Sequence, residues 1–212
     1  MEYIKRISKA LNNHPVRIIE PGGRTQASVA LVLREQPVGL DILFIERATN
    51  ENDYWSGQIG LPGGRTEPGD NNLQDTAERE TREELGLDLG TAQYLGRLSD
   101  SAPGGLKIII SCFVYAVRQY PLLLLDKNEI ADAFWVPVAE FSNPERHSYV
   151  DWVIRNRLRR FPAVKLLEDK KEPLWGITFR LLRDLNKIVN RPSNLIVDKI
   201  RSNRHDHSHK VN

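Results

Sequence analysis

The chain contains one cysteine, Cys112, so it has neither a partner for an intrachain disulfide nor the thiols of a cysteine-rich zinc site. Its neighbours are apolar and β-prone, and we expect a buried structural thiol. Long hydrophobic runs are also missing. No segment approaches the roughly 20 apolar residues that span a bilayer, and the N-terminus has neither a long apolar run nor a secretory cleavage site. These features favour a soluble cytoplasmic protein with no membrane partner.

The chain also lacks an excess of charge of one sign. Its 30 lysine and arginine residues nearly balance 28 aspartate and glutamate residues, which leaves a net charge of +2. Such a small charge gives no reason to expect a nucleic-acid partner. The remaining composition, 40% hydrophobic and 27% charged over 212 residues, is typical of a globular protein with one substantial core.

The order of the apolar patterns predicts an α+β fold. Ile4, Ile7 and Leu11 have helical spacing and indicate a short N-terminal helix. Five β-rich segments follow, at residues 27–33, 41–47, 94–98, 106–117 and 133–138. After Pro144, apolar steps of three and four residues predict two further helices, at residues 150–158 and 177–189.

These elements predict a single layered domain over residues 1–190. It would consist of the N-terminal helix, a core at about residues 27–142 and the C-terminal helices. Residues 191–212 have little apolar content, so we expect a flexible basic tail there.

Residues 48–70 contain five glycines and two prolines, which rules out a regular element and predicts a shaped loop. A helix is then expected to run to Leu85. Asp70 or Asn71 would cap its start, and Gly86 is its stop signal.

The sequence RETREELG, residues 79–86, places three carboxylates close together on that helix. At 100° per residue, Glu80, Glu83 and Glu84 share one face within about 100° of arc. Arg79 can hold Glu83 four residues later, which leaves the other two without a counter-charge. Such a cluster is either a solvated acidic helix face or a site for a hard divalent cation such as Mg²⁺. The glycine loop before the helix favours the second interpretation, because its backbone can approach a metal or ligand closely.

The loop and helix together resemble the Nudix box, which has the pattern G-x5-E-x7-R-E-U-x-E-E-x-G-U, where U is bulky and apolar. Gly64 and residues 79–87 carry the likeness. The spacing between them is one residue longer than in the pattern, and Asp70 stands where the first glutamate would be. This departure is similar to the coenzyme A pyrophosphatase branch of the family.

Segments outside the box resemble the same branch. Residues 43–64, LFIERATNENDYWSGQIGLPGG, are similar to the signature that precedes the box there, although residues 50–54 lack its second arginine. Residues 134–141 and 174–182 also resemble family segments. The likeness covers most of residues 27–190. It implies a Nudix fold, an α/β/α sandwich around a mixed β-sheet, with extra N- and C-terminal helices.

The resemblance implies hydrolysis of the pyrophosphate bond of a nucleoside diphosphate linked to a second group, with Mg²⁺ or Mn²⁺ as cofactor. In the coenzyme A branch, the substrate is coenzyme A or acyl-coenzyme A. The products are adenosine 3′,5′-bisphosphate and phosphopantetheine or its acyl derivative. Two alternatives stay open: the same chemistry on NADH, ADP-ribose, a nucleotide sugar or capped RNA, and a non-catalytic domain that senses a nucleotide. A small nucleotide is the expected partner, and a homodimer is left open.

The resemblance also implies roles for the residues of the box. Glu83 and Glu84 would be the main metal ligands. Glu80 would complete the metal cluster and orient or deprotonate water, and the Gly64 carbonyl would be a further ligand. Arg79 would position Glu83 rather than contact the substrate.

Further candidates lie outside the helix. Glu129 is a candidate general base or water-mediated ligand, with an exposed loop carboxylate as the alternative. Arg47 and Arg65 are placed to meet phosphates, Gly63 would bring backbone close to the substrate, and Trp55 is a candidate for stacking on an adenine. A solvated cation is the alternative for each arginine, and lid or dimer packing is the alternative for Trp55. A basic segment contains Arg155, Arg157, Arg159 and Arg160. It either attracts the 3′-phosphate of coenzyme A or forms a solvated helix face.

Overall fold

The structure is a computed structural model that describes residues 2–49, 55–104, 106–154, 157–168 and 172–191. Some residues named in the sequence analysis lie outside these ranges. They are residues 50–54, where the second arginine of the signature is missing, Arg155, and nearly all of the expected basic tail.

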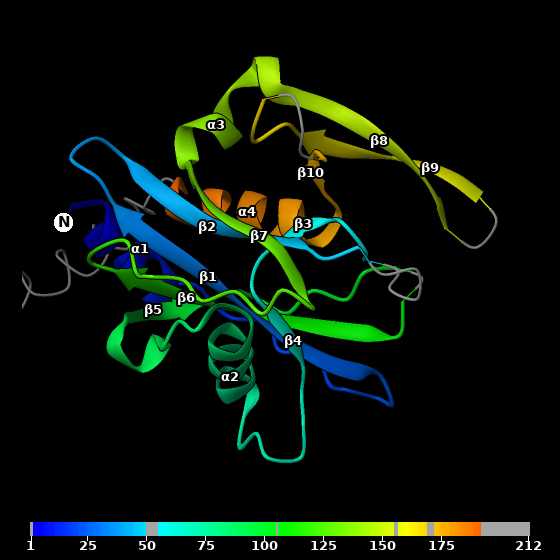
Figure 1. The fold of residues 1–212 in the computed structure, drawn as a ribbon, viewed down its shortest axis with the longest axis horizontal. Helices are drawn as coiled ribbons and strands as arrows, with labels where there is room; N and C mark the ends of the chain where they lie inside the picture. Colours follow the sequence, from blue (N-terminus) through cyan, green and yellow to red (C-terminus); the bar gives the residue numbers. More distant parts are fainter. Residues whose placement is uncertain (1, 50–54, 105, 155–156, 169–171, 192–212) are drawn as a thin grey trace, which may run out of the picture.

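A seven-stranded mixed sheet lies at the centre of the molecule (Figure 1). Its main order is β3-β2-β1-β6-β5, with β4 paired to β1 and β7 paired to β2. Strands β1 and β6 run parallel, and the other pairs are antiparallel. The strands are β1 (Thr25–Glu35), β2 (Leu40–Arg47), β3 (Ile59–Gly60), β4 (Gly63–Arg65), β5 (Gln93–Arg97), β6 (Ile108–Val117) and β7 (Ile130–Pro137).

All five β-rich segments predicted from the sequence lie within or overlap these strands. The expectation that residues 48–70 contain no regular element was wrong in one respect, because β3 and β4 lie there. Both are very short, and the tertiary pairing of β3 with β2 and of β4 with β1 maintains them despite their glycines.

Helices cover both faces of the sheet, which confirms the predicted α/β/α sandwich. They are α1 (Glu2–Asn12), α2 (Leu73–Leu85), α3 (Val138–Ser142) and α4 (Gly176–Val189), with short 3-10 turns at Leu89–Thr91 and Pro144–Arg146. None of the helices in the described ranges is long and apolar enough to cross a membrane.

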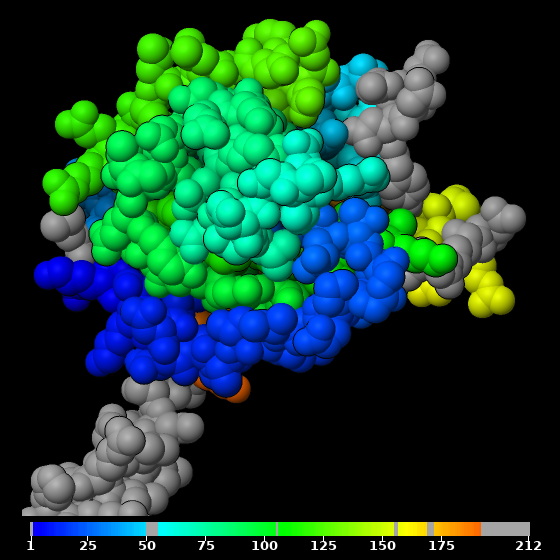
Figure 2. Space-filling view, turned by 90° about the horizontal axis from the view of Figure 1, so that it is seen from below, coloured from blue at the N-terminus to red at the C-terminus, as the bar shows by residue number. Residues whose placement is uncertain are grey.

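Successive side chains of β1 alternate between the two apolar layers. Ala30 and Val32 belong to the cluster that α2 covers. Leu31 and Leu33 belong to the opposite cluster, which α1 and α4 cover. Figure 2, seen from the side of α2, shows the teal and green α2 region across this face, with only an edge of orange α4 visible. The buried Cys112 lies in the sheet, and burial raises the pKa of its thiol to about 12, as expected of a structural thiol.

Helix α2 begins and ends close to the predicted residues. Asn72, not Asp70 or Asn71, is its N-cap, and its side chain accepts hydrogen bonds from the backbone N–H groups of Gln74 and Asp75. Gly86 ends the helix in the left-handed conformation, as predicted. The helix after residue 177 is also confirmed, as α4.

The predicted helix at residues 150–158 was wrong. The chain forms a hairpin there, with strands β8 (His147–Ile154) and β9 (Arg157–Val164), and β10 (Leu174–Trp175) completes a second antiparallel sheet. Apolar residues in this region also alternate with a period of two, and many are β-branched or aromatic. Cross-strand pairing and packing against Trp175 therefore outweigh the local helical spacing. The hairpin projects from the body in Figure 1.

Candidate functional site

The glycine loop and helix α2 meet at two carboxylates. The backbone N–H of Gly63 donates to Glu84 Oε2 over 2.9 Å. At Gly64, an added Cβ would lie 2.4 Å from the Glu80 carboxyl carbon, so only a glycine permits this approach. Gly63 is constrained as well, since its φ is +146° and an added Cβ would lie 2.2 Å from the Ser28 carbonyl oxygen. The two glycines therefore allow β4 to lie directly against the acidic face of α2.

Arg79 connects the loop to the same face. Its guanidinium donates to Asp70 through two hydrogen bonds of 2.8 and 3.0 Å. One nitrogen of the group also lies 3.0 Å from Glu80 Oε1 and 2.8 Å from Glu83 Oε2. The expected Arg79–Glu83 contact is therefore present. The expectation that Glu80 and Glu84 lack a counter-charge was wrong, since Arg79 also contacts Glu80 and the Arg47 guanidinium lies 3.9 Å from Glu84.

Glu84 is the most buried carboxylate of the group, with 2% of its side chain exposed. Burial raises its pKa to about 8, and the charges of Glu80 and Glu129 act in the same direction. Burial also raises the pKa of Glu80, with the carboxylates of Glu83 and Glu129 adding to the shift against the opposing charge of Arg79. The structure thus brings all four glutamates named from the sequence into one electrostatic neighbourhood.

Backbone hydrogen bonds connect Glu129 to this neighbourhood. The Glu84 carbonyl accepts from the N–H of Asp126, whose carbonyl in turn accepts from the N–H of Glu129. The Glu129 carbonyl accepts from the N–H of Ala48 over 2.7 Å, next to the end of β2. The loop before β7 is therefore fastened both to the end of α2 and to the residue that follows Arg47.

Arg47 enters the site from the end of β2. Its guanidinium lies 3.9 Å from Glu84 Oε1 and is 30% exposed, so it can contact both the buried carboxylate and a ligand. The Arg47 N–H donates to the Gln58 carbonyl, and the Gln58 N–H donates to the Trp55 carbonyl. The turn that carries Trp55 therefore adjoins Arg47.

The remaining cations occupy different places. Arg65 is exposed at the end of β4, and its carbonyl accepts from Arg79. Arg157, Arg159 and Arg160 lie on β9, not on a helix. Arg160 pairs with Asp151 on the neighbouring strand, at 2.9 Å. Arg47 and Arg65 therefore lie beside the glycine loop. The basic segment lies on the projecting hairpin.

The donor chemistry of the site fits a hard divalent cation. Within the described ranges, no group of three or more carboxylate, imidazole or thiol side chains is arranged closely enough to hold a metal ion. Nevertheless, Glu80 and Glu84 hold raised pKa values because they are buried and lie near other carboxylates, and a cation would relieve both effects. Carboxylate oxygens are the ligands that Mg²⁺ and Mn²⁺ prefer.

Sequence reasoning missed the role of Asp70. Its carboxylate is 3% exposed and accepts hydrogen bonds from Arg79, Thr76 and the Glu67 N–H. The hydrogen bonds from Arg79 are the main reason that its pKa lies far below the usual range. The available signal was that Asp70 stands where the box has its first glutamate, an acidic position shortly before α2.

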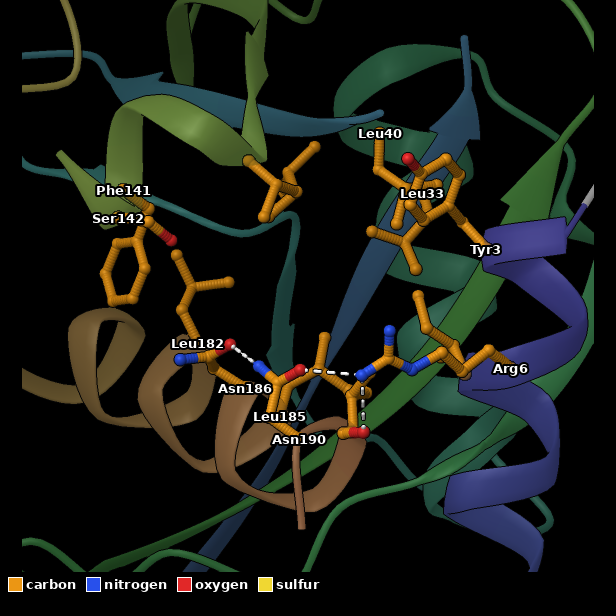
Figure 3. A pocket seen from close by; sticks show the side chains of 14 residues that line it. Tyr3, Arg6, Leu33, Leu40, Phe141, Ser142, Leu182, Leu185, Asn186 and Asn190 are labelled. Atoms are coloured by element: carbon orange, nitrogen blue, oxygen red, sulfur yellow. Dashed lines mark hydrogen bonds between the residues drawn. The ribbon is translucent and has the colours of Figure 1, made fainter. Parts of the chain in front are cut away.

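A separate apolar cavity of about 190 Å³ lies between α1 and α4 (Figure 3). Leu33 and Leu182 line it, and Arg6 reaches across its edge to donate to Asn190 Oδ1 over 2.8 Å. These residues belong to the face of the sheet opposite α2. The cavity is therefore distinct from the glutamate site.

Comparison with known proteins supports a family assignment. The sequence family described as NUDIX domain matches residues 24–158. A probable nudix hydrolase of Schizosaccharomyces pombe is 30% identical over 172 residues, which cover 80% of this chain and 59% of the relative. The uncharacterized Nudix hydrolase NudL of Yersinia enterocolitica is 26% identical over 185 residues, which cover 86% of this chain and 85% of the relative.

An uncharacterized S. pombe protein is 36% identical over 111 residues, which are 34% of its length. The chain thus spans between about a third and three fifths of these two fission-yeast relatives. Among solved structures, a MutT/nudix family protein from Enterococcus faecalis superposes with a TM-score of 0.51 at 15% identity, covering 84% of this chain and 66% of that one. This likeness shows the fold.

Proposed function

Because the chain belongs to the NUDIX domain family, we propose that it hydrolyses the pyrophosphate bond of a nucleoside diphosphate linked to a second group. One observation carries the proposal: buried Glu84 lies beside Glu80, against the Gly63–Gly64 backbone, with Arg47 at its exposed edge. A carboxylate cluster for a cation and an adjacent guanidinium for an anion are what an anionic diphosphate substrate requires.

Each residue has a defined part in this proposal. Glu80, Glu83 and Glu84 would hold the cation together with the Gly64 carbonyl. Bound Mg²⁺ or Mn²⁺ would neutralise the phosphate oxygens and lower the pKa of an attacking water. Arg79 positions Glu80 and Glu83 and is itself held by Asp70.

Two side chains would act directly on the substrate. Arg47 would bind a phosphate at the exposed edge of the cluster, since 30% of its side chain faces solvent. Glu129 would accept a proton from the attacking water, a role supported by its position in the loop whose backbone is hydrogen-bonded to the end of α2. Trp55, on the turn that adjoins Arg47, would cover the base.

We further propose that the substrate is coenzyme A or an acyl-coenzyme A. The segment at residues 43–64, the aspartate at position 70 and the one extra residue between Asp70 and Arg79 support this choice through their resemblance to the coenzyme A branch. In the structure, Asp70 accepts two hydrogen bonds from Arg79.

A substrate panel tests both levels of the proposal. Purified protein would be incubated with coenzyme A, NADH, ADP-ribose and a nucleotide sugar, with Mg²⁺ or with a chelator, and the phosphate products separated by chromatography. We expect cleavage only with the metal and fastest with coenzyme A. Fastest cleavage of ADP-ribose or NADH would keep the chemistry and reject the substrate. No cleavage of any compound would favour a nucleotide-sensing domain.

A further inference from the structure

We propose that the outer face of the β8–β9 hairpin is a docking surface for a second copy of this chain. The hairpin projects from the body (Figure 1), and its two faces differ. On the inner face, Trp152 and Phe161 pack around Trp175, with ring centroids 5.0 and 5.5 Å from the Trp175 ring. The outer face is exposed and carries large apolar side chains.

Three large apolar side chains are exposed together on this outer face. Tyr149 is 70% exposed, Val153 is 57% exposed and Leu158 is 69% exposed. The strand register places Val153 directly opposite Leu158, and Tyr149 directly opposite Pro162. Residues directly opposite on antiparallel strands point to the same face of a sheet. The four side chains therefore lie on one face as two exposed apolar pairs, which we call the apolar stripe, and clustered exposed apolar surface is typical of an interaction site.

An ion pair divides the stripe. Asp151 and Arg160 lie opposite each other between the two apolar pairs, and two hydrogen bonds of 2.9 and 3.1 Å join them. Along the hairpin the outer face thus reads apolar, charged, apolar. Each layer has its two members on different strands, with the negative group on β8 and the positive group on β9.

This arrangement is self-complementary. A two-fold axis that runs along the hairpin, between its strands, brings β8 of one copy over β9 of the other. Asp151 of each copy then faces Arg160 of the other copy. In the same way, Val153 faces Leu158, and Tyr149 faces Pro162. Such an isologous contact pairs opposite charges in the middle and apolar groups on both sides. The inner faces, which turn toward their own bodies, do not obstruct it.

The size of the surface sets the expected strength. Each strand has eight residues, so the hairpin is about 27 Å long and about two strand spacings wide. This is smaller than a standard interface of about 800 Å² per partner. We therefore expect a weak, reversible dimer that dissociates on dilution.

Sedimentation over a dilution series of the full chain tests the proposal. Tyr149→Asp and Leu158→Asp each place a charge in the apolar stripe and should leave only monomer. Val38→Asp is the matched control, because Val38 is 91% exposed but lies in the turn between β1 and β2. Far-UV circular dichroism checks that each variant is folded. Monomer alone in the wild type at every concentration, or a dimer that persists in both stripe variants, would overturn the proposal.

A charge-reversal mixture tests the pairing itself. Asp151→Arg and Arg160→Asp each place like charges at the centre of a homodimer, so each variant alone should be monomeric. Mixing the two should restore association, because every contact at the centre of the mixed dimer then joins opposite charges. The charge pair within each hairpin stays broken in that mixture, so recovery depends on contact between copies. Failure of the mixture to associate would overturn the proposed two-fold arrangement.

Discussion

Arg79 holds Asp70 through two hydrogen bonds across the loop that leads into α2, at 2.8 and 3.0 Å. The same guanidinium contacts Glu80 and Glu83, so a residue outside the glutamate cluster fixes the geometry of two of its members. Because a bidentate arginine–carboxylate pair has a defined plane, Asp70 determines the direction from which Arg79 approaches the helix. A change at Asp70 should therefore affect both folding and catalysis.

We expect Asp70→Asn to lower the free energy of unfolding at neutral pH by about 1.5–3 kcal/mol, the usual contribution of a hydrogen bond to a charged group. Urea unfolding would measure this, with Glu67→Gln, an exposed carboxylate on the same loop, as the control. The low pKa of Asp70 also fixes the pH dependence. The contribution is complete above the ordinary carboxyl pKa and is lost as pH falls through the lower value of the folded state. The difference between wild type and Asp70→Asn should therefore shrink in acid, and a difference that grows there would contradict this account.

Glu84 should give the opposite pH dependence in metal-free protein. Its pKa is raised to about 8 by burial, so the folded state binds its proton more tightly than the unfolded state does. The contribution is complete below the ordinary carboxyl pKa and is lost as pH rises through about 8. In a chelator, the free energy of unfolding should therefore fall across this range by on the order of a few kcal/mol.

The control for this effect is Glu84→Gln, which has no proton to lose and should show a flatter profile. Excess Mg²⁺ should also flatten the wild-type profile, since a bound cation favours the ionised carboxylate. Identical profiles for wild type and Glu84→Gln would show that Glu84 is not held protonated in the metal-free fold.

Gly64→Ala should abolish activity while leaving the fold largely in place. The new Cβ would lie 2.4 Å from the Glu80 carboxyl carbon, so the flexible glutamate side chain must move away from the loop. Gly69→Ala is a matched control on the same loop, because no atom lies within 4 Å of its added Cβ. Steady-state rates with coenzyme A would separate the two. Equal rates would mean that the approach of Gly64 to Glu80 has no part in catalysis.

Glu84→Gln should reduce kcat more than Glu129→Gln does. The amide keeps the size of the side chain and removes the charge that would hold a cation. A loss of at least ~10²-fold is typical when a single electrostatic stabiliser of the transition state is removed. Glu129 has a single proposed role in proton transfer, which solvent can partly replace. A larger loss at Glu129 would reassign the dominant role to the loop before β7.

What the sequence could predict depended on how local the determining interactions are. Helix α2 was located almost to the residue, because its cap and its Gly86 stop are encoded within a few positions. The β8–β9 hairpin was mistaken for a helix, because its apolar residues fit both a helical and a strand period, and the packing on Trp175 that favours the strands comes from outside the segment. Asp70 was recognised as a departure from the box, but its hydrogen bonds to Arg79 depend on the loop conformation. The Arg47–Glu84 contact likewise joins a strand end to a helix distant in sequence.

The last prediction concerns the 3′-phosphate that distinguishes coenzyme A from dephospho-coenzyme A. Arg47 already lies at the carboxylate cluster, 3.9 Å from Glu84, so it is placed for the diphosphate that is cleaved. Arg65 lies exposed at the end of β4, away from that contact, and is the better placed cation for a second phosphate. We expect dephospho-coenzyme A to be a poorer substrate by about 1.5–3 kcal/mol in kcat/KM, the worth of hydrogen bonds to a charged group.

Arg65→Gln should remove most of this preference by lowering kcat/KM for coenzyme A alone, whereas Arg47→Gln should slow both substrates together. Arg159→Gln is the comparison variant on β9, where the basic segment offers the other candidate cation. If Arg159→Gln removes the preference and Arg65→Gln does not, the hairpin binds the 3′-phosphate. If wild type does not distinguish the two substrates, the pantetheine arm determines recognition, and neither arginine has the proposed role.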